Sequence, residues 1–387
     1  MKLPIDLKAV IEAATDIESA RSTPVSVSVL IDDSAPGDVA AHVRSAFVGA
    51  GAHARVTVGY FAGPAFSPYE GDDMAVIVAG FSEEVGRRAA EIRAAGVPVM
   101  VVTSMPSLVA DMASAYGNPI PEGDLVAPEG VEGCETDGDA ACASGEVAGA
   151  HVSVFTGIRA AKSVGAGAAA GFAGAAASSP DVLDAPIPID AAAACALDRR
   201  MGEWVVAACR EKRLALALSF PFVCKPLSLE AVSATSLQNA GIGLVLFIPG
   251  ADMPLMTLNQ AKMLLQIAAA YGEPMSAARV KELAAIVAGG FACRSVARQV
   301  AGVVPGVGWA VKAGVGYAGT KAMGLAAIEY FERGGNIAGL AGVVSSATAK
   351  ATQIAGDVAA TPAGARVLSI AKTAIRQGAA SVLKKTE

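Results

Sequence analysis

Two pairs of aspartates are the residues of this chain best suited to chemistry by type and position. Asp32 and Asp33 directly follow one strand-like run of residues, and Asp72 and Asp73 directly precede another. Hard divalent cations prefer carboxylate oxygens, so these four residues could gather such a cation near the C-terminal edge of a sheet. Aspartate beside a strand also commonly forms turns and caps helices, and we favour that interpretation.

The segment after the first predicted strand does not form a phosphate-binding loop. A P-loop, G-x-x-x-x-G-K-[ST], needs glycines that let backbone N–H groups surround the phosphates, a lysine, and a hydroxyl that binds Mg²⁺. Residues 32–38, DDSAPGD, contain no lysine and bring three carboxylates to the place that a polyphosphate would approach. The Lys-Ser and Lys-Thr pairs of the chain begin at Lys162, Lys372 and Lys385, and none of them follows a glycine.

Other motifs of nucleotide-binding proteins and hydrolases are also missing. No D-x-x-G sequence occurs, no asparagine precedes a lysine, and no G-x-G-x-x-G follows a strand. G-x-S-x-G and H-E-x-x-H do not occur either, and we expect His42 and His53 to be structural or surface residues. The sequence therefore predicts no catalytic residue, no cofactor and no metal site. A weak alternative is a non-standard nucleotide site at the sheet edge, near Asp33, Gly80 and Ser104.

The predicted strands and helices indicate an α/β domain in the first third of the chain. Four short runs, rich in β-branched or apolar residues, have the length of strands: 25–31, 55–61, 74–79 and 97–103. Three stretches have the apolar spacing of helices: 5–20, 38–50 and 83–95. Strands that alternate with helices predict a mainly parallel, doubly wound sheet over residues 1–121, with its ligand edge at the C-terminal ends of the strands.

The character of the chain changes after residue 121. Residues 122–189 are first acidic and then rich in Ala and Gly, which predicts an insert or linker. Helical spacing then dominates, over 190–213, 257–271, 276–289 and 295–330. The final stretch, 336–387, is predicted to be an amphipathic helical tail. It is locally basic, because six Lys or Arg residues oppose two acidic residues between Ile337 and Glu387.

Three segments of the helical part carry distinctive motifs: SFPFV at 219–223, NAGIGLVLFIPGADMPLMTLNQAKMLLQIAAAYG at 239–272 and RQVAGVVPGVG at 298–308. Over about residues 200–335 the chain resembles the YcjF-like family, also known as domain of unknown function 697. In many relatives this helical domain follows an Era- or TrmE-like GTPase domain, and members are often regarded as membrane-associated. The resemblance implies a degenerate GTPase-like α/β domain over residues 1–121, lacking the nucleotide motifs, and a helical domain over residues 190–335.

Five residues of the resembling part form a candidate structural or interaction cluster: Asp252, Pro254, Gln260, Arg294 and Arg298. Asp252 can accept backbone N–H groups at the start of a helix whose first turn suits Pro254. Gln260 lies on that helix and could bond a neighbouring backbone group. Arg294 and Arg298 are four residues apart, hence on one helix face, and could pair with Asp252 or with an acidic partner. We favour a structural polar cluster over an active site.

Composition and charge exclude several classes of protein. The net charge of −6 argues against nucleic-acid binding, which needs a basic face. The six cysteines form no C-x-x-C pair and the three histidines lie far from most of them, so we expect reduced thiols and no zinc site. These features, together with an N-terminus that lacks the apolar region of a signal peptide, predict a cytoplasmic protein.

No stretch of the sequence is an unambiguous membrane span. Residues 231–251 are long enough but polar in their first half, and residues 299–327 are interrupted by Lys312 and Lys321. Peripheral attachment to the inner face of the cell membrane is one interpretation of the apolar faces and the basic tail. The other is that these faces are buried against each other or in a homo-oligomer, and the sequence leaves both open.

The sequence thus predicts a non-catalytic, GTPase-like scaffold whose helical domain contacts a membrane or a partner protein. The alternative function is that of a divergent nucleotide-binding protein or GTPase. That alternative would use the weak site at the sheet edge.

Overall fold

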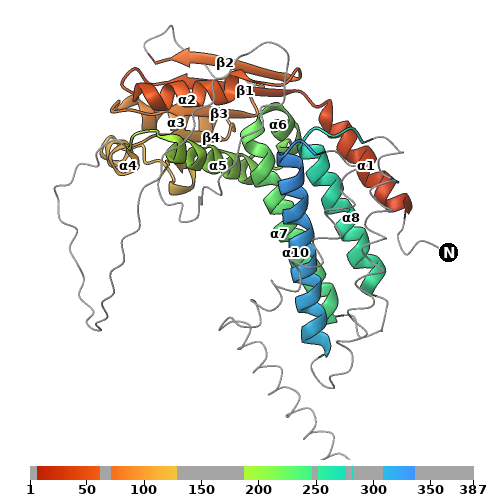
Figure 1. The fold of residues 1–387 in the computed structure, drawn as a ribbon. Helices are drawn as coiled ribbons and strands as arrows, with labels where there is room; N and C mark the ends of the chain where they lie inside the picture. Colours follow the sequence, from red (N-terminus) through yellow and green to blue (C-terminus); the bar gives the residue numbers. More distant parts are fainter. Residues whose placement is uncertain are drawn as a thin grey trace, which may run out of the picture.

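The protein combines a parallel sheet, covered by helices, with a helical arm (Figure 1). The structure is a computed structural model that describes residues 7–61, 71–128, 187–245, 252–275 and 308–335, together with Lys281. The sheet is built from the first third of the chain. The arm gathers helices from both ends of the described chain.

The five described strands form one sheet in the order β2-β1-β3-β4-β5, and all neighbours are parallel. Their bounds are β1 Val25–Ile31, β2 Ala54–Tyr60, β3 Met74–Val78, β4 Val99–Val102 and β5 Leu125–Val126. β3 and β4 are buried along their whole length, which explains why their sequences are continuously apolar. β2 lies at the edge of the sheet and is only partly buried. The parallel sheet predicted from the sequence is confirmed.

The strand order places a topological switch point between β1 and β3. The chain leaves β1 for β2 on one side and then crosses to β3 on the other side of β1. In doubly wound sheets the ligand crevice forms at such a point, between the loops that follow the two strands. Any ligand chemistry of this sheet therefore depends on the loops after β1 and β3.

Four helices cover the two faces of the sheet: α2 Gly37–Val48, α3 Glu84–Ala94, α4 Pro106–Ala115 and α5 Ala191–Ala208. Val27, Val29 and Val76 share one core with α2 and α5. Leu30 and Ile77 point to the opposite face and share a core with α3 and α4. Successive side chains of a strand alternate between faces, so each central strand contributes to both cores.

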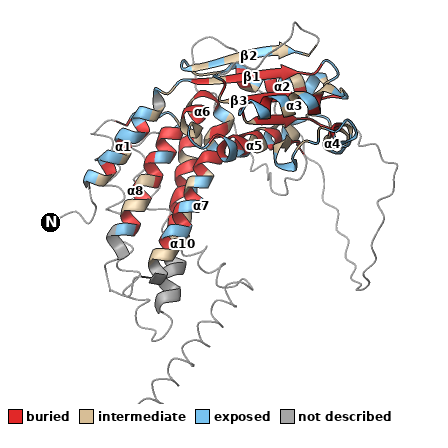
Figure 2. Cartoon of the chain, turned by 180° about the vertical axis from the view of Figure 1, so that it is seen from behind, coloured by how far each residue is buried: buried red, intermediate tan, exposed pale blue. Residues whose placement is uncertain are grey.

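The arm contains five described helices: α1 Leu7–Arg21, α6 Arg213–Ser219, α7 Pro221–Val245, α8 Asp252–Ala270 and α10 Gly308–Glu332. Figures 1 and 2 both show α1, α7, α8 and α10 side by side, and the colours of Figure 2 mark buried residues where these helices face one another. α1 belongs to the arm although it precedes the sheet in sequence. Its buried residues Val10, Ala14 and Ile17 recur at helical spacing and share a core with α8 and α10.

Small side chains let α10 pack closely against α7. Ala318, Ala322 and Ala326 recur every four residues on α10 and are buried. A Cβ atom added to Gly324 would lie 2.3 Å from Cγ2 of Val232 on α7. The high Ala and Gly content of the sequence therefore serves helix contact at this point.

The core of the sheet continues into helices that the sequence analysis groups with the helical domain, beginning at residue 190. Leu197 and Trp204 of α5 and Leu216 of α6 belong to the same hydrophobic cluster as the strands. Where α7 begins, the ring of Phe220 contacts that of Phe47 on α2, with centroids 5.0 Å apart. α5 thereby completes the face of the sheet that α2 covers in part.

Polar contacts attach the arm to the sheet at the N-terminal ends of the strands. Nζ of Lys212 lies 2.7 Å from Oδ1 of Asp73, which precedes β3, and donates to the carbonyl of Pro24, which precedes β1, at 3.1 Å. The N–H of Gly51, ahead of β2, donates to the carbonyl of Ser219 at 3.1 Å. The arm therefore lies at the edge opposite to the one where a doubly wound sheet binds ligands.

Several local expectations need correction. Residues 190–213 were expected to form one helix, but α5 ends at Ala208 and a separate helix, α6, begins at Arg213. Residues 122–126 were expected to belong to the insert, but they form a 3-10 turn, Glu122–Asp124, and the strand β5. A strand of two residues is too short to show a periodic pattern, which explains why the sequence did not reveal it.

None of the described helices is long and apolar enough to cross a membrane. Most of the insert over 122–189, the stretch 276–289 apart from Lys281, and the tail over 336–387 lie outside the described residues.

The close contact of α7 and α10 predicts opposite effects for two glycines of α10. Gly324→Ala should lower the free energy of unfolding by about 1–3 kcal/mol, because the new methyl group would overlap Val232. Gly319→Ala is the matched control, since a Cβ there meets nothing within 4 Å, and it should be neutral or stabilise the helix by up to about 1 kcal/mol. Urea denaturation measures both. Equal effects of the two substitutions would contradict the close packing.

Candidate functional site

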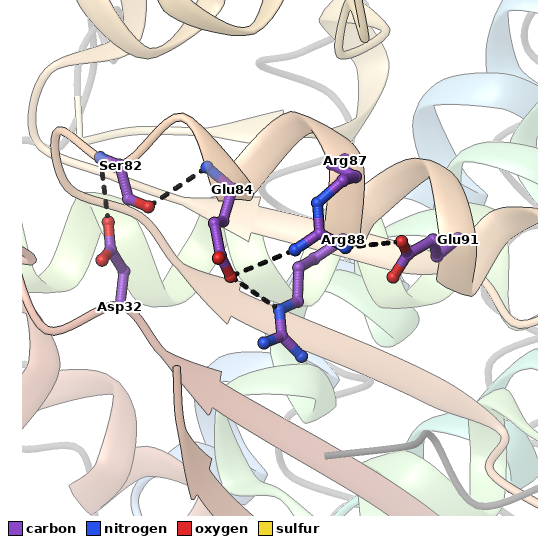
Figure 3. A network of polar contacts seen from close by, with 6 residues as sticks. All are labelled: Asp32, Ser82, Glu84, Arg87, Arg88 and Glu91. Atoms are coloured by element: carbon purple, nitrogen blue, oxygen red, sulfur yellow. Dashed lines mark hydrogen bonds and ion pairs between the residues drawn. The ribbon is translucent and has the colours of Figure 1, made fainter. Parts of the chain in front are cut away.

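The carboxylate of Asp32 occupies the switch point between β1 and β3. Asp32 is buried directly after β1, and its Oδ2 accepts the N–H groups of Gly80 at 3.0 Å and of Ser82 at 3.3 Å from the loop after β3. Figure 3 shows the contact between Asp32 and Ser82 at the start of α3. A single side chain thus joins the two loops between which a ligand would have to enter.

The hydroxyl of Ser34 completes this junction. Ser34 donates from Oγ to Oδ2 of Asp32 at 2.8 Å and accepts the N–H of Phe81 at 2.8 Å. Three successive N–H groups, of residues 80, 81 and 82, therefore bond to side chains of the β1 loop. Successive backbone N–H groups often form an anion site in proteins, and here the anion is a carboxylate of the chain itself.

The two loops also touch through their backbones. A Cβ atom added to Gly80 would lie 2.3 Å from the carbonyl carbon and oxygen of Ser34. Glycine is needed at this position because any side chain would collide with that backbone. Between Gly80 and Ser34 the crevice is closed.

The N-terminus of α2 is also supplied with a negative charge by the chain. Oδ1 of Asp38 accepts the N–H of Val39 at 2.9 Å, and its Oδ2 accepts the N–H of Ile189 at 3.2 Å. In dinucleotide- and P-loop-type folds, the helix after the first strand offers its N–H groups to a phosphate. A phosphate at this position would meet the Asp38 carboxylate.

The residues of the weak nucleotide alternative occupy three different environments. The N–H of Gly80 donates to the carboxylate of Asp32. Asp33, the next residue after Asp32, is exposed. Ser104, in the loop after β4, is buried, and its Oγ has no partner among the described residues. Its carbonyl accepts the N–H of Ile187 at 3.2 Å, so the chain that enters α5 covers this loop.

A chain of polar contacts runs from Asp32 onto α3 (Figure 3). Oγ of Ser82 accepts the N–H of Glu84 at 3.1 Å, and Glu84 pairs with Arg88 and Arg87, each at 3.3 Å. Arg87 also donates to Glu91 at 2.7 Å, and this hydrogen bond raises the pKa of the guanidinium. These groups cap α3 and pair along its surface, which is a structural role.

Asp72 and Asp73 do not join Asp32 and Asp33, so the hypothesis of a four-aspartate cation site is wrong. Both precede β3 and therefore lie at the N-terminal edge of a parallel sheet, whereas Asp32 and Asp33 follow β1. Asp72 accepts hydrogen bonds from two serine hydroxyls of β1, and Asp73 pairs with Lys212. Over the described ranges, no group of three or more His, Cys, Asp or Glu side chains could hold a metal ion.

The candidate cluster in the helical domain is described in part. Asp252 is the first residue of α8, and Pro254 falls in its first turn, as expected from the sequence. Gln260 is buried on α8 and donates from Nε2 to the hydroxyl of Thr320 on α10 at 2.9 Å. Arg294 and Arg298 lie outside the described residues.

A buried polar network around Gln260 joins α7, α8 and α10. Nδ2 of Asn239 on α7 donates to Thr320 Oγ1 at 2.9 Å and to the carbonyl of Met256 at 3.4 Å. Asn259 on α8 donates to Oδ1 of Asn239 at 3.1 Å. None of these side chains is charged, and both Asn239 and Thr320 are fully buried. A buried network of this kind fixes the register of three helices.

Asn239 and Thr320 are not among the site residues predicted from the sequence, although the sequence contains a signal for Asn239. Ser228, Val232, Thr235 and Asn239 are buried on α7 at spacings of four, three and four, which is the spacing of one helix face. The uncharged polar residues of α7 therefore include a stripe that faces the core. Thr320 does not belong to a polar stripe of this kind, because most side chains of α10 are apolar and many are Ala or Gly.

Cys209, Cys224 and His42 add no nucleophile to these sites. Burial raises the pKa of the Cys209 thiol to about 12, with a contribution from the charge of Asp73, and burial raises that of Cys224 to about 12. Both thiols therefore stay protonated at neutral pH. His42 Nε2 lies 2.8 Å from Asp198 and joins α2 to α5, which is the structural role expected of it.

Comparison with known proteins adds no assignment, because no family model, no curated protein and no solved structure matches the chain. The interpretation therefore depends on two sites of the structure. One is the edge of the sheet around Asp32, and the other is the polar network of the arm around Asn239.

Removal of the Asp32 carboxylate is expected to leave the anion site empty. Asp32→Ala should lower the free energy of unfolding by about 3 kcal/mol, because buried N–H groups lose a charged acceptor. Formate, a carboxylate small enough for the vacated space, should raise the melting temperature of this variant and not of the wild type. Glu83→Ala, at an exposed neighbouring carboxylate, is the control and should stay within about 0.5 kcal/mol of the wild type. A loss for Asp32→Ala no larger than that of the control would disprove the role of this carboxylate.

The polar network of the arm makes a second prediction about stability. Asn239→Ala should lower the free energy of unfolding by about 2–3 kcal/mol, because the buried hydroxyl of Thr320 loses one of its donors and the amide of Asn259 loses an acceptor. Gln238→Ala changes an exposed neighbour on α7 and should be close to neutral. Chemical denaturation measures both variants. A double-mutant cycle with Thr320→Val should give a coupling energy, whereas strictly additive losses would argue against the network.

Proposed function

We propose that the protein is a non-catalytic, GTPase-like scaffold whose helical arm binds a membrane surface or a partner protein. The observation that carries this proposal is the occupation of the switch point by Asp32. The sheet retains the layout of a ligand-binding fold but fills its ligand edge with side chains of the chain. Function is then best sought on the surfaces of the molecule, and first on the arm.

The non-catalytic part of the proposal is supported by the charges at the sheet edge. A nucleotide phosphate would have to displace the Asp32 carboxylate from the N–H groups of residues 80 and 82, and it would also meet Asp38 at the start of α2. Neither loop offers a lysine or arginine to compensate. The alternative of a divergent nucleotide site at Asp33, Gly80 and Ser104 lacks this support, because Gly80 is already engaged.

The binding part of the proposal is supported by two exposed leucines near the far end of the arm. Leu237 of α7 is 63% exposed and Leu255 of α8 is 47% exposed. They lie at the same level of the arm, because Asn239 bonds to Met256. From Ala231 to Val245, α7 has no charged side chain. We propose that these two leucines form the apolar part of the surface by which the arm contacts a membrane or another protein.

The resemblance of residues 200–335 to the YcjF-like family agrees with this assignment. Members of that family are often regarded as membrane-associated and often follow a GTPase domain. None of the described helices is long and apolar enough to cross a membrane, and the contact that we propose for the arm is a peripheral one. The membrane surface is therefore the first partner to test.

Liposome flotation of the full chain tests the proposal. We expect the wild type to float with vesicles of phosphatidylcholine and phosphatidylglycerol. The double variant Leu237→Ser/Leu255→Ser should lose at least about tenfold in affinity, because each leucine contributes roughly 1.5–3 kcal/mol when fully buried. Tyr116→Ser, which alters an exposed aromatic residue on the sheet part, is the matched control and should float like the wild type.

Further arms of the flotation experiment separate the ways to attach. A chain without residues 337–387 that still floats would assign attachment to the arm, and loss of flotation would assign it to the tail. If the wild type stays in the soluble fraction, the membrane part of the proposal is wrong. Equal losses in the leucine variant and in Tyr116→Ser would instead argue against a specific face.

A further inference from the structure

Phe81 is an exposed aromatic residue held on a fixed loop at the C-terminal edge of the sheet. Its side chain is 51% exposed, although it follows directly on the buried strand β3. The N–H groups of Gly80, Phe81 and Ser82 all bond to Asp32 or Ser34, so the backbone is fixed on both sides of the ring. An exposed ring on a pre-organised loop loses little freedom on binding, and such aromatics commonly anchor interfaces.

The loop segments around Phe81 are acidic, and the nearby arginines of α3, Arg87 and Arg88, are paired with Glu84. Asp33, next to Ser34, is exposed, and so is Glu83, two residues after Phe81. The segments that link strands to helices at this edge, 32–36, 79–83 and 103–105, contain no lysine or arginine. A partner for this surface therefore needs positive charges next to apolar side chains.

The chain itself contains a segment of that chemistry. Residues 366–385, RVLSIAKTAIRQGAASVLKK, contain five Lys or Arg and no acidic residue, and they interleave these with Val, Leu and Ile. The chain as a whole has a net charge of −6. Opposite charges are thus segregated between this basic segment and the rest of the protein.

The basic segment has enough preceding chain to reach the acidic edge. The described chain ends at Gly335, just after α10, where Glu332 pairs with Lys225 near the start of α7 at 3.1 Å. The thirty residues 336–365 span about 45 Å even at the short rise of a helix. A strand of seven residues such as β1 is only about 23 Å long, so the opposite edge of the sheet is within reach.

We infer that the acidic surface around Phe81, with Asp33 and Glu83, docks residues 366–385 of the same chain. In this contact the apolar side chains of the segment cover the ring of Phe81, and its lysines and arginines face the carboxylates. The contact goes beyond the function proposed for the arm and does not depend on it. It keeps the most basic segment of the protein away from anionic surfaces until one competes for it.

Zero-length crosslinking of the full chain with a carbodiimide tests this contact, because that reagent joins a carboxylate directly to a neighbouring amine. Mass spectrometry of the monomer band should find amide links from Asp33 or Glu83 to Lys372, Lys384 or Lys385. Phe81→Ala should lower the yield of these links at least about fivefold by removing the apolar anchor, and high salt should lower it further. Tyr116→Ala removes an equally exposed aromatic residue from the end of α4 and should leave the yield unchanged.

Three results would overturn the inference. One is a yield that is the same in Phe81→Ala and in the wild type. Another is an even spread of links from the three lysines over the other exposed carboxylates, which would show no preference for this edge. Links found only in a crosslinked dimer would assign the surface to a second copy and would exclude the contact within one chain.

Discussion

A parallel sheet must be covered on both faces, and the arrangement of the whole protein follows from this constraint. β3 and β4 are apolar along their entire length, and α3 and α4 cover only one side of them. On the other side α2 is joined by α5, which the chain reaches only after the insert. Because α6 and α7 follow α5 directly, the arm lies at the N-terminal ends of the strands. The arm does not cover the C-terminal edge of the sheet.

At the C-terminal edge of the sheet, the switch point is filled by side chains and backbone of the protein itself. The Asp32 carboxylate takes the backbone N–H groups that a bound anion would use, and Gly80 lets the two loops approach until their backbones touch. The same contacts fix Phe81 at the surface. The occupation of the switch point by a carboxylate and the fixed, exposed position of an aromatic residue are therefore two consequences of one set of hydrogen bonds.

The sequence predicted β1 to β4, α2 and α3, because buried parallel strands are continuous apolar runs that can be recognised without their partners. It did not predict α4 or β5, and it did not place α5 against the sheet. It failed where structure depends on distant residues. The direction of β3 separates Asp72 from Asp32, although both lie beside strands in the sequence. The absence of charge near Asn239 was visible, but its partner Thr320 lies 81 residues away on a helix without a polar pattern. The closure of the edge by Asp32 likewise depends on a loop 48 residues later.

The central claim is that the ligand edge of the sheet is already occupied, and equilibrium dialysis of the full chain with GTP and with ATP, each with Mg²⁺, tests it most directly. The account predicts no saturable binding of either nucleotide by the wild type, because its phosphates would have to displace Asp32. Micromolar binding that is lost on substitution of Asp33 or Ser104 would contradict it. Such a result would show that the edge opens to a ligand in spite of its internal carboxylate.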